Sequence, residues 1–488
     1  MRKVFLTLLI LAVGSPCFAK YSGGTGEPNN PYKIATAEDL NDIGNHIEDF
    51  NKCFIITADI NLAQYTGRQY RIIGNSYPYF TGTFDGNEHI IRNLNCTAPY
   101  SNYVGLFGYT SNAIIKNVHL EDVNISTIAD YTGGLVGYQA NGSIINCSST
   151  GSINITASSS PVSWSYTGGL VGRLTNGNIT DCFSTGSVST ISSFLDSLSR
   201  AGGLVGEQIN GTITNSYSTD SVKTTSSYSN YYSYAGGLVG YSSGNISNCY
   251  SAGSVTNYSP AVYAGGLMGY QSDSSSAKIE KCYSIGQVSA AGTYVHEGGL
   301  IGRSRGTVIS CFWDINTSGQ SVGIGSGTAT GVTGETTAQM KTLSTFTSVG
   351  WDFVGETVNG PNDAWAICEG TNYPKLTWQI LPGDIVCPDG VDFEDLDELC
   401  YQWLVEEIPA DLAPPPSGDG IVDFADFAVF AKQWGITNSF NELLDFTGQW
   451  LKTGLAKCSA DIAPLPGGDG QVNFADFAIM ANNWLKGF

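Results

Sequence analysis

The chain is poor in positive charge, in histidine and in long apolar runs. Its 488 residues hold 22 Lys and Arg against 43 Asp and Glu, and the formal net charge is −21. So acidic a chain repels phosphate backbones, and we therefore expect no nucleic-acid partner. No stretch reaches the ~20 apolar residues that cross a bilayer, so no transmembrane segment is expected. There are only four histidines and no His-Glu-x-x-His sequence, so the zinc-peptidase motif is absent.

The N-terminus is typical of a secretory signal. Arg2 and Lys3 precede a short apolar run, and the tripeptide Cys17-Phe18-Ala19 suits an exit site, with cleavage before Lys20. We expect a secreted, extracellular protein, with association to the cell surface as an option. Eleven cysteines remain after the signal is removed, and in an oxidising compartment these can pair or stay free.

Glycine is abundant, and its spacing is the strongest feature of the sequence. The pentapeptide Gly-Gly-Leu-Val-Gly recurs, and its first glycines are 29 to 35 residues apart. A fixed period in this range is typical of stacked repeats, in which no copy buries its apolar face without its neighbours. The copies lie at residues 133–137, 168–172, 202–206 and 236–240, with variants at 265–269 and 298–302 and a weaker copy at 104–108.

Each repeat has the same internal order. The glycine strand is followed by an Ile, an Asn or Asp, a Cys and a Ser-Thr-Gly turn. Short β segments broken by such turns predict a mainly β fold, a parallel solenoid with three sheets. If Ile179 and Cys182 both point inward, the chain must bend at Asp181 in a left-handed conformation. The Ser-rich stretches at 158–165, 192–199 and 226–233 are predicted to be surface loops.

The cysteines also recur in register. An internal column of small buried groups is one interpretation, since a free Cys packs as a small apolar residue. Metal or redox chemistry is another, although neither His nor Cys-x-x-Cys accompanies these residues. Disulfides between neighbouring coils stay open, because the strand spacing overlaps the required Cα separation. The column consists of Cys147, Cys182, Cys249, Cys282 and Cys311, with Ser216 in one position.

Two flanking segments are predicted to close the stack. Thr36 and Asp39 form a capping-box pattern, followed by Leu40, Ile43 and Ile47 on one helical face. This short N-terminal capping helix should cover one open end. At the other end, the aromatic-rich residues 311–380 should pack over the last coil, with a sugar platform as the alternative.

These motifs resemble the GLUG repeat of bacterial secreted proteins. The resemblance is carried by the Gly-Gly-Leu-Val-Gly copies with partners such as Asn248-Cys249-Tyr250-Ser251, and it covers roughly residues 21–380. The segments around Phe84-Asp85-Gly86 and from Cys311 to Trp378 are similar to flanks in such proteins. The resemblance implies a right-handed β-helix outside the cell or at its surface, with no established enzymatic role.

The C-terminal fifth concentrates the negative charge. Residues 384–488 contain 18 acidic and 4 basic residues, and two passages are near copies, each with an Asp-Gly pair before an apolar helix. A Ca²⁺ ion needs six to eight oxygens, a Gly at the sharp turn and a closing carboxylate. The expected ligands are Asp419 and Asp469 in mid-loop, Ile421 and Gln471 through backbone carbonyls, Asp423 and Asn473 directly or through water, and Asp426 and Asp476 from the first helical turn.

These passages resemble type I dockerin repeats, which implies a small all-α, EF-hand-like domain and a cohesin-like or other surface protein as partner. The first loop position departs from the pattern, because Pro415 and Leu465 occupy it. Asp411 and Asp461 lie eight residues before the mid-loop acids and could reach the ion through a longer loop. A third, degenerate copy has Asp389, Asp392 and Asp395. The alternative is that these acids only cap helices.

The predicted organisation has five parts. They are a signal at 1–19, an N-terminal cap with the first coils at 20–103, the repeat β-helix at 104–310, the closing segment at 311–380, and the dockerin-like region at 381–488.

Two functions from different classes follow. One is a non-enzymatic β-helix scaffold for adhesion or carbohydrate interaction, with polysaccharide along its coils and a calcium-dependent attachment. The other is a polysaccharide lyase or glycoside hydrolase that carries a dockerin, an analogy from fold alone. The second would be favoured if three or more charged side chains converge on one face of the coils.

Overall fold

The computed structural model contains two compact units, Met1–Trp351 and Asp352–Phe488. The described residues are 20–97, 101–157, 162–192, 196–227, 232–273, 277–328, 330–355, 363–381, 384, 386–388 and 395. The predicted signal and nearly all of the acidic C-terminal region lie outside them.

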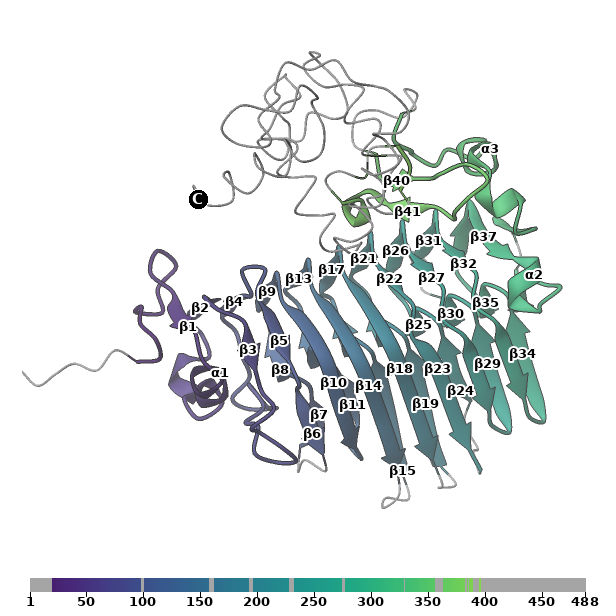
Figure 1. Cartoon of the computed structure of the whole chain (residues 1–488). Helices are drawn as coiled ribbons and strands as arrows, with labels where there is room; N and C mark the ends of the chain where they lie inside the picture. The colour runs from purple at the N-terminus through teal and green to yellow at the C-terminus, as the bar shows by residue number, and fades with distance from the viewer. Residues whose placement is uncertain are drawn as a thin grey trace, which may run out of the picture. The chain divides into compact units, whose positions relative to one another are not determined.

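The first unit is a parallel β-solenoid whose strands form four long sheets, not three; Figure 1 shows its coils lying side by side. In chain order these strands belong to sheets that we number one to four. The prediction of three sheets was wrong because the double glycine bends the chain, so that the glycine strand is divided between sheets one and two. The handedness of the winding stays a prediction.

Sheets one and two flank the double glycines. Sheet one has seven strands: β7 (Tyr103–Val104), β11 (Tyr131–Gly133), β15 (Val162–Gly168), β19 (Asp196–Gly202), β24 (Ser233–Gly236), β29 (Ala261–Gly265) and β34 (Tyr294–Gly298). Sheet two has eight: β8 (Phe107–Ser111), β12 (Val136–Ala140), β16 (Val171–Thr175), β20 (Val205–Ile209), β25 (Val239–Ser242), β30 (Met268–Gln271), β35 (Ile301–Ser304) and β38 (Ile324–Gly327).

Sheets three and four complete each coil. Sheet three has ten strands: β1 (Tyr32–Ile34), β2 (Cys53–Ile56), β4 (Thr83–Asp85), β9 (Ile114–Lys116), β13 (Ser143–Ile145), β17 (Asn178–Thr180), β21 (Thr212–Thr214), β26 (Asn245–Ser247), β31 (Lys278–Glu280) and β36 (Thr307–Ile309). Sheet four has fourteen: β3 (Ile60–Asn61), β5 (Ile90–Arg92), β6 (Asn95–Thr97), β10 (His119–Thr127), β14 (Ser148–Ala157), β18 (Phe183–Ser192), β22 (Tyr217–Ser218), β23 (Ser221–Ser226), β27 (Tyr250–Ser251), β28 (Val255–Tyr258), β32 (Tyr283–Ser284), β33 (Val288–Ala291), β37 (Cys311–Asp314) and β39 (Val332–Glu335).

The repeats lie on one another in register, which confirms the stacked architecture. Gly133 pairs with Gly168, Gly168 with Gly202, and the match continues to Gly298. Burial of each leucine that follows the double glycine removes its side chain from water and contributes about 2 kcal/mol. These leucines are all fully buried in one column: Leu106, Leu135, Leu170, Leu204, Leu238, Leu267 and Leu300.

The double glycine is required by close packing. A Cβ on Gly133 would lie 2.3 Å from the carbonyl oxygen of Val136, and one on Gly203 would lie 2.0 Å from Ser218 Oγ. The second glycine therefore leaves room for a column of buried serines in sheet four. That column consists of Ser149, Ser184, Ser218, Ser251 and Ser284.

The predicted bend between the inward Ile and Cys is confirmed. Ile179 and Cys182 are both fully buried, and Asp181 between them has φ 54°. Asn tolerates this left-handed conformation better than most residues, which explains its recurrence at the corner. The same corner is formed in other coils by Asn117, Asn146, Asn215, Asn248, Lys281 and Ser310, with φ between 46° and 53°.

The cysteine column is made of free, buried thiols, as the first interpretation predicted. Each Sγ donates to the carbonyl oxygen two residues earlier at 3.1–3.2 Å, and Ser216 Oγ makes the equivalent bond at 2.7 Å. Burial raises the pKa of the Cys182, Cys282 and Cys311 thiols well above the ordinary value, so these groups stay protonated.

The prediction of surface loops at 158–165, 192–199 and 226–233 was partly wrong. Strands β14 and β18 extend to Ala157 and Ser192, and β15, β19 and β24 begin inside the predicted loops. These extensions enclose a second, smaller core, and burial of its apolar side chains stabilises the extended strands. It consists of Val188, Ala201, Val222, Ala235, Val255, Val262, Ala264 and Val288.

The N-terminal helix is present but shorter than predicted. Helix α1 (Ala37–Ile43) has the Thr36–Asp39 capping box, and Leu40 and Ile43 are buried in the main core. Ile47 does not share that face. It begins the 3₁₀ turn η1 (Ile47–Asp49) and is 56% exposed, because the helix ends at Gly44.

Aromatic rings pack at the last coil within the first unit. Phe312, Phe346 and Trp351 have ring centroids 4.9–5.8 Å apart, and Trp351 Nε1 donates to the Ser310 carbonyl at 2.9 Å. The helical elements of this segment are α2 (Ile315–Ser318), η2 (Gln339–Lys341) and α3 (Leu343–Thr347), and β38 follows α2.

The second unit is described over a short stretch. Strands β40 (Trp365–Ala366) and β41 (Lys375–Leu376) pair antiparallel, and η3 (Thr377–Gln379) follows. A disulfide joins Cys368 to Cys387.

Candidate functional site

Two columns of large polar side chains follow the double glycines along the solenoid. One position lies two residues before each double glycine, on sheet one, and the other directly follows the last glycine, on sheet two. Column one is Tyr103, Tyr131, Tyr166, Arg200, Tyr234, Tyr263 and His296. Column two is Tyr109, Tyr138, Arg173, Glu207, Tyr241, Tyr270 and Arg303.

The tyrosine rings stack along the coils. Tyr131 lies between Tyr103 and Tyr166 with ring centroids 5.0 Å apart on both sides and interplanar angles of 8° and 9°. This distance follows the ~4.8 Å spacing of neighbouring strands. The columns also touch each other, since Tyr131 and Tyr138 have centroids 5.4 Å apart. Both faces of the Tyr131 ring are therefore covered by neighbouring rings.

An ion-paired centre interrupts the tyrosines. Glu207 is 1% exposed, and its carboxylate pairs with Arg173 Nε at 2.8 Å and with Arg200. The three groups carry a net charge of +1. Burial lowers the pKa of Arg200 from its ordinary value, yet the guanidinium stays charged because that value is so high.

The two guanidiniums of this centre also lie over tyrosine rings. The Arg200 guanidinium is 3.9 Å from the Tyr241 centroid and 5.5 Å from Tyr166, and that of Arg173 is 5.4 Å from Tyr138. In cation–π contacts of this kind, the electrons of the ring face attract the guanidinium. This attraction partly replaces the guanidinium's contacts with water.

A second cation lies at the far end of the columns. Arg303 Nη1 donates to Tyr263 Oη at 2.6 Å, and the guanidinium lies 5.5 Å from that ring. His296 stacks on Tyr263 with centroids 5.0 Å apart. Burial and the nearby Arg303 charge lower the pKa of His296, so the imidazole is neutral at neutral pH.

Most tyrosine hydroxyls of the columns are available to a ligand. Among the residues that the structure describes, six of them have no hydrogen-bond partner, and their side chains are partly exposed. A phenol hydroxyl both donates and accepts a hydrogen bond. These are the hydroxyls of Tyr103, Tyr109, Tyr138, Tyr234, Tyr241 and Tyr270.

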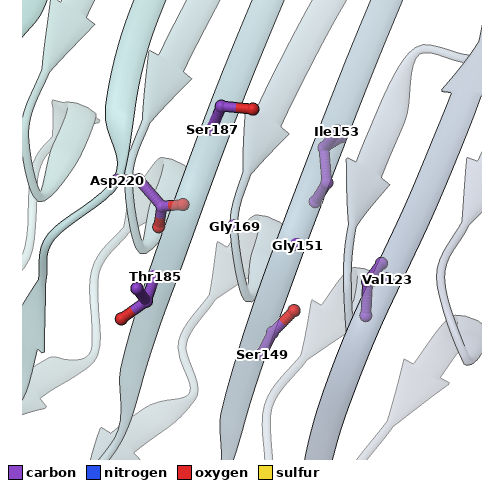
Figure 2. A pocket seen from close by; sticks show the side chains of 8 residues that line it. All are labelled: Val123, Ser149, Gly151, Ile153, Gly169, Thr185, Ser187 and Asp220. Atoms are coloured by element: carbon purple, nitrogen blue, oxygen red, sulfur yellow. The ribbon is translucent and has the colours of Figure 1, made fainter. Parts of the chain in front are cut away.

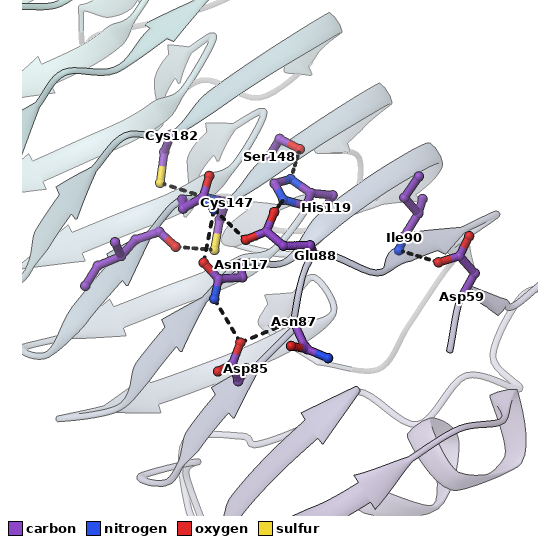
Figure 3. Close-up of polar contacts among 12 residues, drawn as sticks. Asp59, Asp85, Asn87, Glu88, Ile90, Asn117, His119, Cys147, Ser148 and Cys182 are labelled. Atoms are coloured by element: carbon purple, nitrogen blue, oxygen red, sulfur yellow. Dashed lines mark hydrogen bonds and ion pairs between the residues drawn. The ribbon is translucent and has the colours of Figure 1, made fainter. Parts of the chain in front are cut away.

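A Ser-His-Glu arrangement occurs at the first coils (Figure 3). His119 Nδ1 lies 3.0 Å from Ser148 Oγ, and His119 Nε2 lies 3.2 Å from Glu88. Ser148 is only 4% exposed and sits between neighbouring strands, so its hydroxyl is poorly placed to attack a substrate. The arrangement, with the Asp85–Asn117 bond at 3.0 Å beside it, joins successive coils.

A narrow gap between coils surrounds a buried acid (Figure 2). Asp220 is 2% exposed, and its Oδ2 accepts from Ser218 Oγ at 3.2 Å. Burial is the main cause that raises the pKa of Asp220 to about 7, against hydrogen bonds from Ser184 and Ser218. Because most of the lining is buried, the gap belongs to the interior. It is lined by Val123, Ser149, Gly151, Ile153, Gly169, Thr185, Ser187 and Asp220.

An acidic cluster near the N-terminus is ion-paired with a lysine side chain. Oxygens of Glu48 and Asp49 converge with a His46 nitrogen. Lys20 Nζ lies 2.8 Å from Glu48 and 2.6 Å from Asp49, so the ammonium pairs with both carboxylates.

The predicted calcium ligands fall almost entirely outside the described residues. Among them only Asp395 is described, and its Oδ1 accepts from the Val386 backbone N–H at 2.9 Å. The calcium sites therefore stay a prediction. Those outside are Asp389, Asp392, Asp411, Asp419, Ile421, Asp423, Asp426, Asp461, Asp469, Gln471, Asn473 and Asp476.

The tyrosine columns were missed by the sequence interpretation, although their signal was present. A Tyr precedes or follows most double-glycine copies at fixed offsets, as in Tyr131 and Tyr138 or Tyr234 and Tyr241. The His119 partners were missed because Ser148 and Glu88 lie about one coil away in sequence.

Comparison with known families identifies the repeats. The family of the GLUG motif matches residues 129–156, 165–189, 197–223 and 231–256. The chain carries GLUG repeats in a parallel β-solenoid. The matched segments include both columns over the middle coils, so the tyrosine positions belong to the repeat unit of this GLUG solenoid.

Two curated proteins share part of the sequence. Halomucin of Haloquadratum walsbyi is 32% identical over 150 residues, 29% of this chain and 2% of halomucin. A protein of Evansella cellulosilytica, provisionally named a Gly-rich membrane protein, is 29% identical over 133 residues, 26% of this chain and 15% of that protein. The GLUG solenoid thus spans a small fraction of both relatives. Of the described helices, none is long and apolar enough to cross a membrane.

Among the solved structures that match, one aligns with most of the chain. It comes from Bacteroides ovatus and is provisionally named an immunoglobulin A1 protease, with a TM-score of 0.48 and 21% identity. The match covers 73% of this chain and 95% of that one. A similarity at this level assigns no activity to this chain.

Proposed function

We propose that the GLUG solenoid is a secreted, non-enzymatic scaffold that binds polysaccharide along its two tyrosine columns. The observation that carries this proposal is the row of six phenol hydroxyls without a partner among the described residues. A sugar polymer presents hydroxyls at every ring, and each can exchange hydrogen bonds with a phenol. Because the coils repeat every ~4.8 Å, a polymer aligned with the solenoid meets similar groups again and again.

The mode of binding follows from the ring stacking. Tyr131 is covered on both faces by Tyr103 and Tyr166, so a sugar cannot stack on it. The sugar instead meets ring edges and hydroxyls, and hydrogen bonds supply the specificity. This differs from the sugar platform that was the alternative interpretation of residues 311–380, where rings would offer their faces.

Removal of the hydroxyls tests the proposal without disturbing the stacks. The variant Y138F/Y241F/Y270F keeps each ring and deletes three exposed oxygens. Three lost hydrogen bonds at ~1 kcal/mol each should weaken polysaccharide binding by about a hundredfold, measured by affinity electrophoresis or calorimetry on the full chain. The melting temperature should stay within a few degrees. Unchanged affinity in a variant that still folds would exclude the columns as the binding surface.

Secretion is supported by independent features. The N-terminal residues have the pattern of a cleaved signal, and the Cys368–Cys387 disulfide suits an oxidising compartment. Detection of the mature chain in culture medium or the surface fraction, beginning at Lys20, tests this part.

Attachment is proposed to run through the acidic C-terminal region and Ca²⁺, with a cohesin-like or other surface protein as partner. The matched Asp-Gly loops at Asp419 and Asp469 support it, since calcium prefers clustered carboxylate and carbonyl oxygens. Calorimetry of the full chain should show Ca²⁺ binding that the variant D419N/D469N loses. No heat at millimolar Ca²⁺ would overturn the metal assignment. A chelator should also release the partner in a pull-down from the surface fraction.

Polysaccharide cleavage is the alternative function, and one observation favours it. Three charged groups, Arg173, Arg200 and Glu207, do converge on one face. However, a general acid or base must reach a substrate proton, and the Glu207 carboxylate is buried between two guanidiniums. Turnover assays with pectin, alginate and neutral glucans decide between the two. Robust turnover that the E207Q variant abolishes would replace the scaffold proposal.

A further inference from the structure

We infer that the polysaccharide bound by the columns is acidic, with isolated carboxylates among neutral sugars, one paired with Arg303 and another with the Arg173–Arg200 centre. The inference rests on the proposed function and assigns the chemical class of its ligand.

The columns are cationic within an acidic chain. They hold three Arg and one Glu, a net charge of +2 with neutral His296. Residues 20–351 as a whole contain 15 Lys and Arg and 21 Asp and Glu, a net charge of −6. The local charge therefore has the opposite sign to its surroundings, and the columns attract an anion where the rest of the solenoid does not.

Arg303 has unused donors. One of its five N–H groups is engaged by Tyr263 Oη, and no carboxylate of a described residue lies within ion-pair distance of it. A guanidinium prefers a planar, two-oxygen partner, which a sugar carboxylate supplies through two parallel hydrogen bonds. At the other centre Glu207 neutralises one of two guanidiniums, and the Arg173 side chain is 25% exposed.

The spacing of the cations favours sparse charge on the ligand. Arg173 and Arg303 both belong to column two and are four coils apart, which is ~19 Å along the solenoid. Tyr241 and Tyr270 lie between them with their neutral hydroxyls. A densely charged polyanion would place most of its charges beside these phenols, in a protein of negative charge. A neutral polymer would leave Arg303, and one of the two guanidiniums that share Glu207, without a counter-charge.

The experiment measures binding of the full chain to four polymers at ~0.15 M ionic strength. They are hyaluronan, in which uronate and neutral sugars alternate, polygalacturonate, neutral hydroxyethyl cellulose and densely charged dextran sulfate. Hyaluronan should bind most tightly. Because a hydrogen-bonded charge contributes ~1.5–3 kcal/mol, R303Q should weaken that binding about tenfold or more, and R303K should fall between R303Q and the parent chain.

The matched control is K223Q, which removes one exposed cation from sheet four. It should change hyaluronan affinity less than twofold. Equal losses in R303Q and K223Q, or tightest binding to dextran sulfate, would overturn the inference. Tightest binding to the neutral polymer, unaffected by R303Q, would overturn it and leave the proposed function standing. Absence of binding to all four polymers would overturn both.

Discussion

Replacement of Asp220 by Asn should stabilise the solenoid at pH 8 and leave its stability nearly unchanged at pH 4. Asp220 lies at a position where neighbouring coils have glycine, namely Gly151, Gly186, Gly253 and Gly286. Asp220 therefore places a carboxyl group in the interior at a position where the neighbouring coils have no side chain. Asn keeps its shape and its contact with Ser218 but cannot ionise.

The magnitude follows from the pKa of Asp220, which burial raises from 3.8 to about 7. In the unfolded chain the carboxyl loses its proton near pH 4, whereas in the folded chain it keeps the proton until about pH 7. Between these values the folded state binds more protons, so stability falls as the pH rises. Three pKa units at ~1.4 kcal/mol each predict a loss of about 4 kcal/mol, complete above pH 7.

Urea denaturation of both full chains at a series of pH values measures the effect. The difference between D220N and the parent in free energy of unfolding cancels the titration of all other groups. It should rise from near zero at pH 4 to about 4 kcal/mol at pH 8. A second variant, D220G, restores the residue of the neighbouring coils but leaves a gap. Its free energy of unfolding at pH 8 should therefore rise less than that of D220N. A difference that does not change with pH would refute the reasoning.

Two further predictions concern packing. G203A forces a Cβ against Ser218 Oγ and the Gly237 carbonyl, so it should lower the free energy of unfolding by ~1–3 kcal/mol, and S218A in the same chain should recover part of the loss. A stable single variant would show that the sheets can separate at little cost. The buried thiols Cys182 and Cys282, with raised pKa values, should not react with a thiol reagent in the native protein and should react fully in denaturant. Rapid labelling in the native state would contradict the burial of these two thiols.

Much of the fold was predictable because the repeat carries its own register. When Gly133, Gly168 and Gly202 recur at nearly one interval, each copy meets the same residues on its neighbours, so burial of one leucine implies burial of all. The left-handed corner at Asp181 followed from the three-residue separation of two inward side chains. The strand extensions at β15 and β19 were less predictable, because stretches in which Ser recurs at every second position fit both loops and strands until a second core supports them.

The sequence by itself determined the period, the inward leucines and cysteines, and the positions of the tyrosines, since these depend on local alternation and on repetition. Only the tertiary structure decided which side chains of neighbouring coils contact each other. It brought Glu207 between Arg173 and Arg200, placed Ser148 against His119, and stacked Tyr131 between Tyr103 and Tyr166. Most of these contacts join residues about one coil apart in sequence, whereas Arg200 and Glu207 meet across the bend at the double glycine, and sequence spacing alone does not reveal how sharp that bend is.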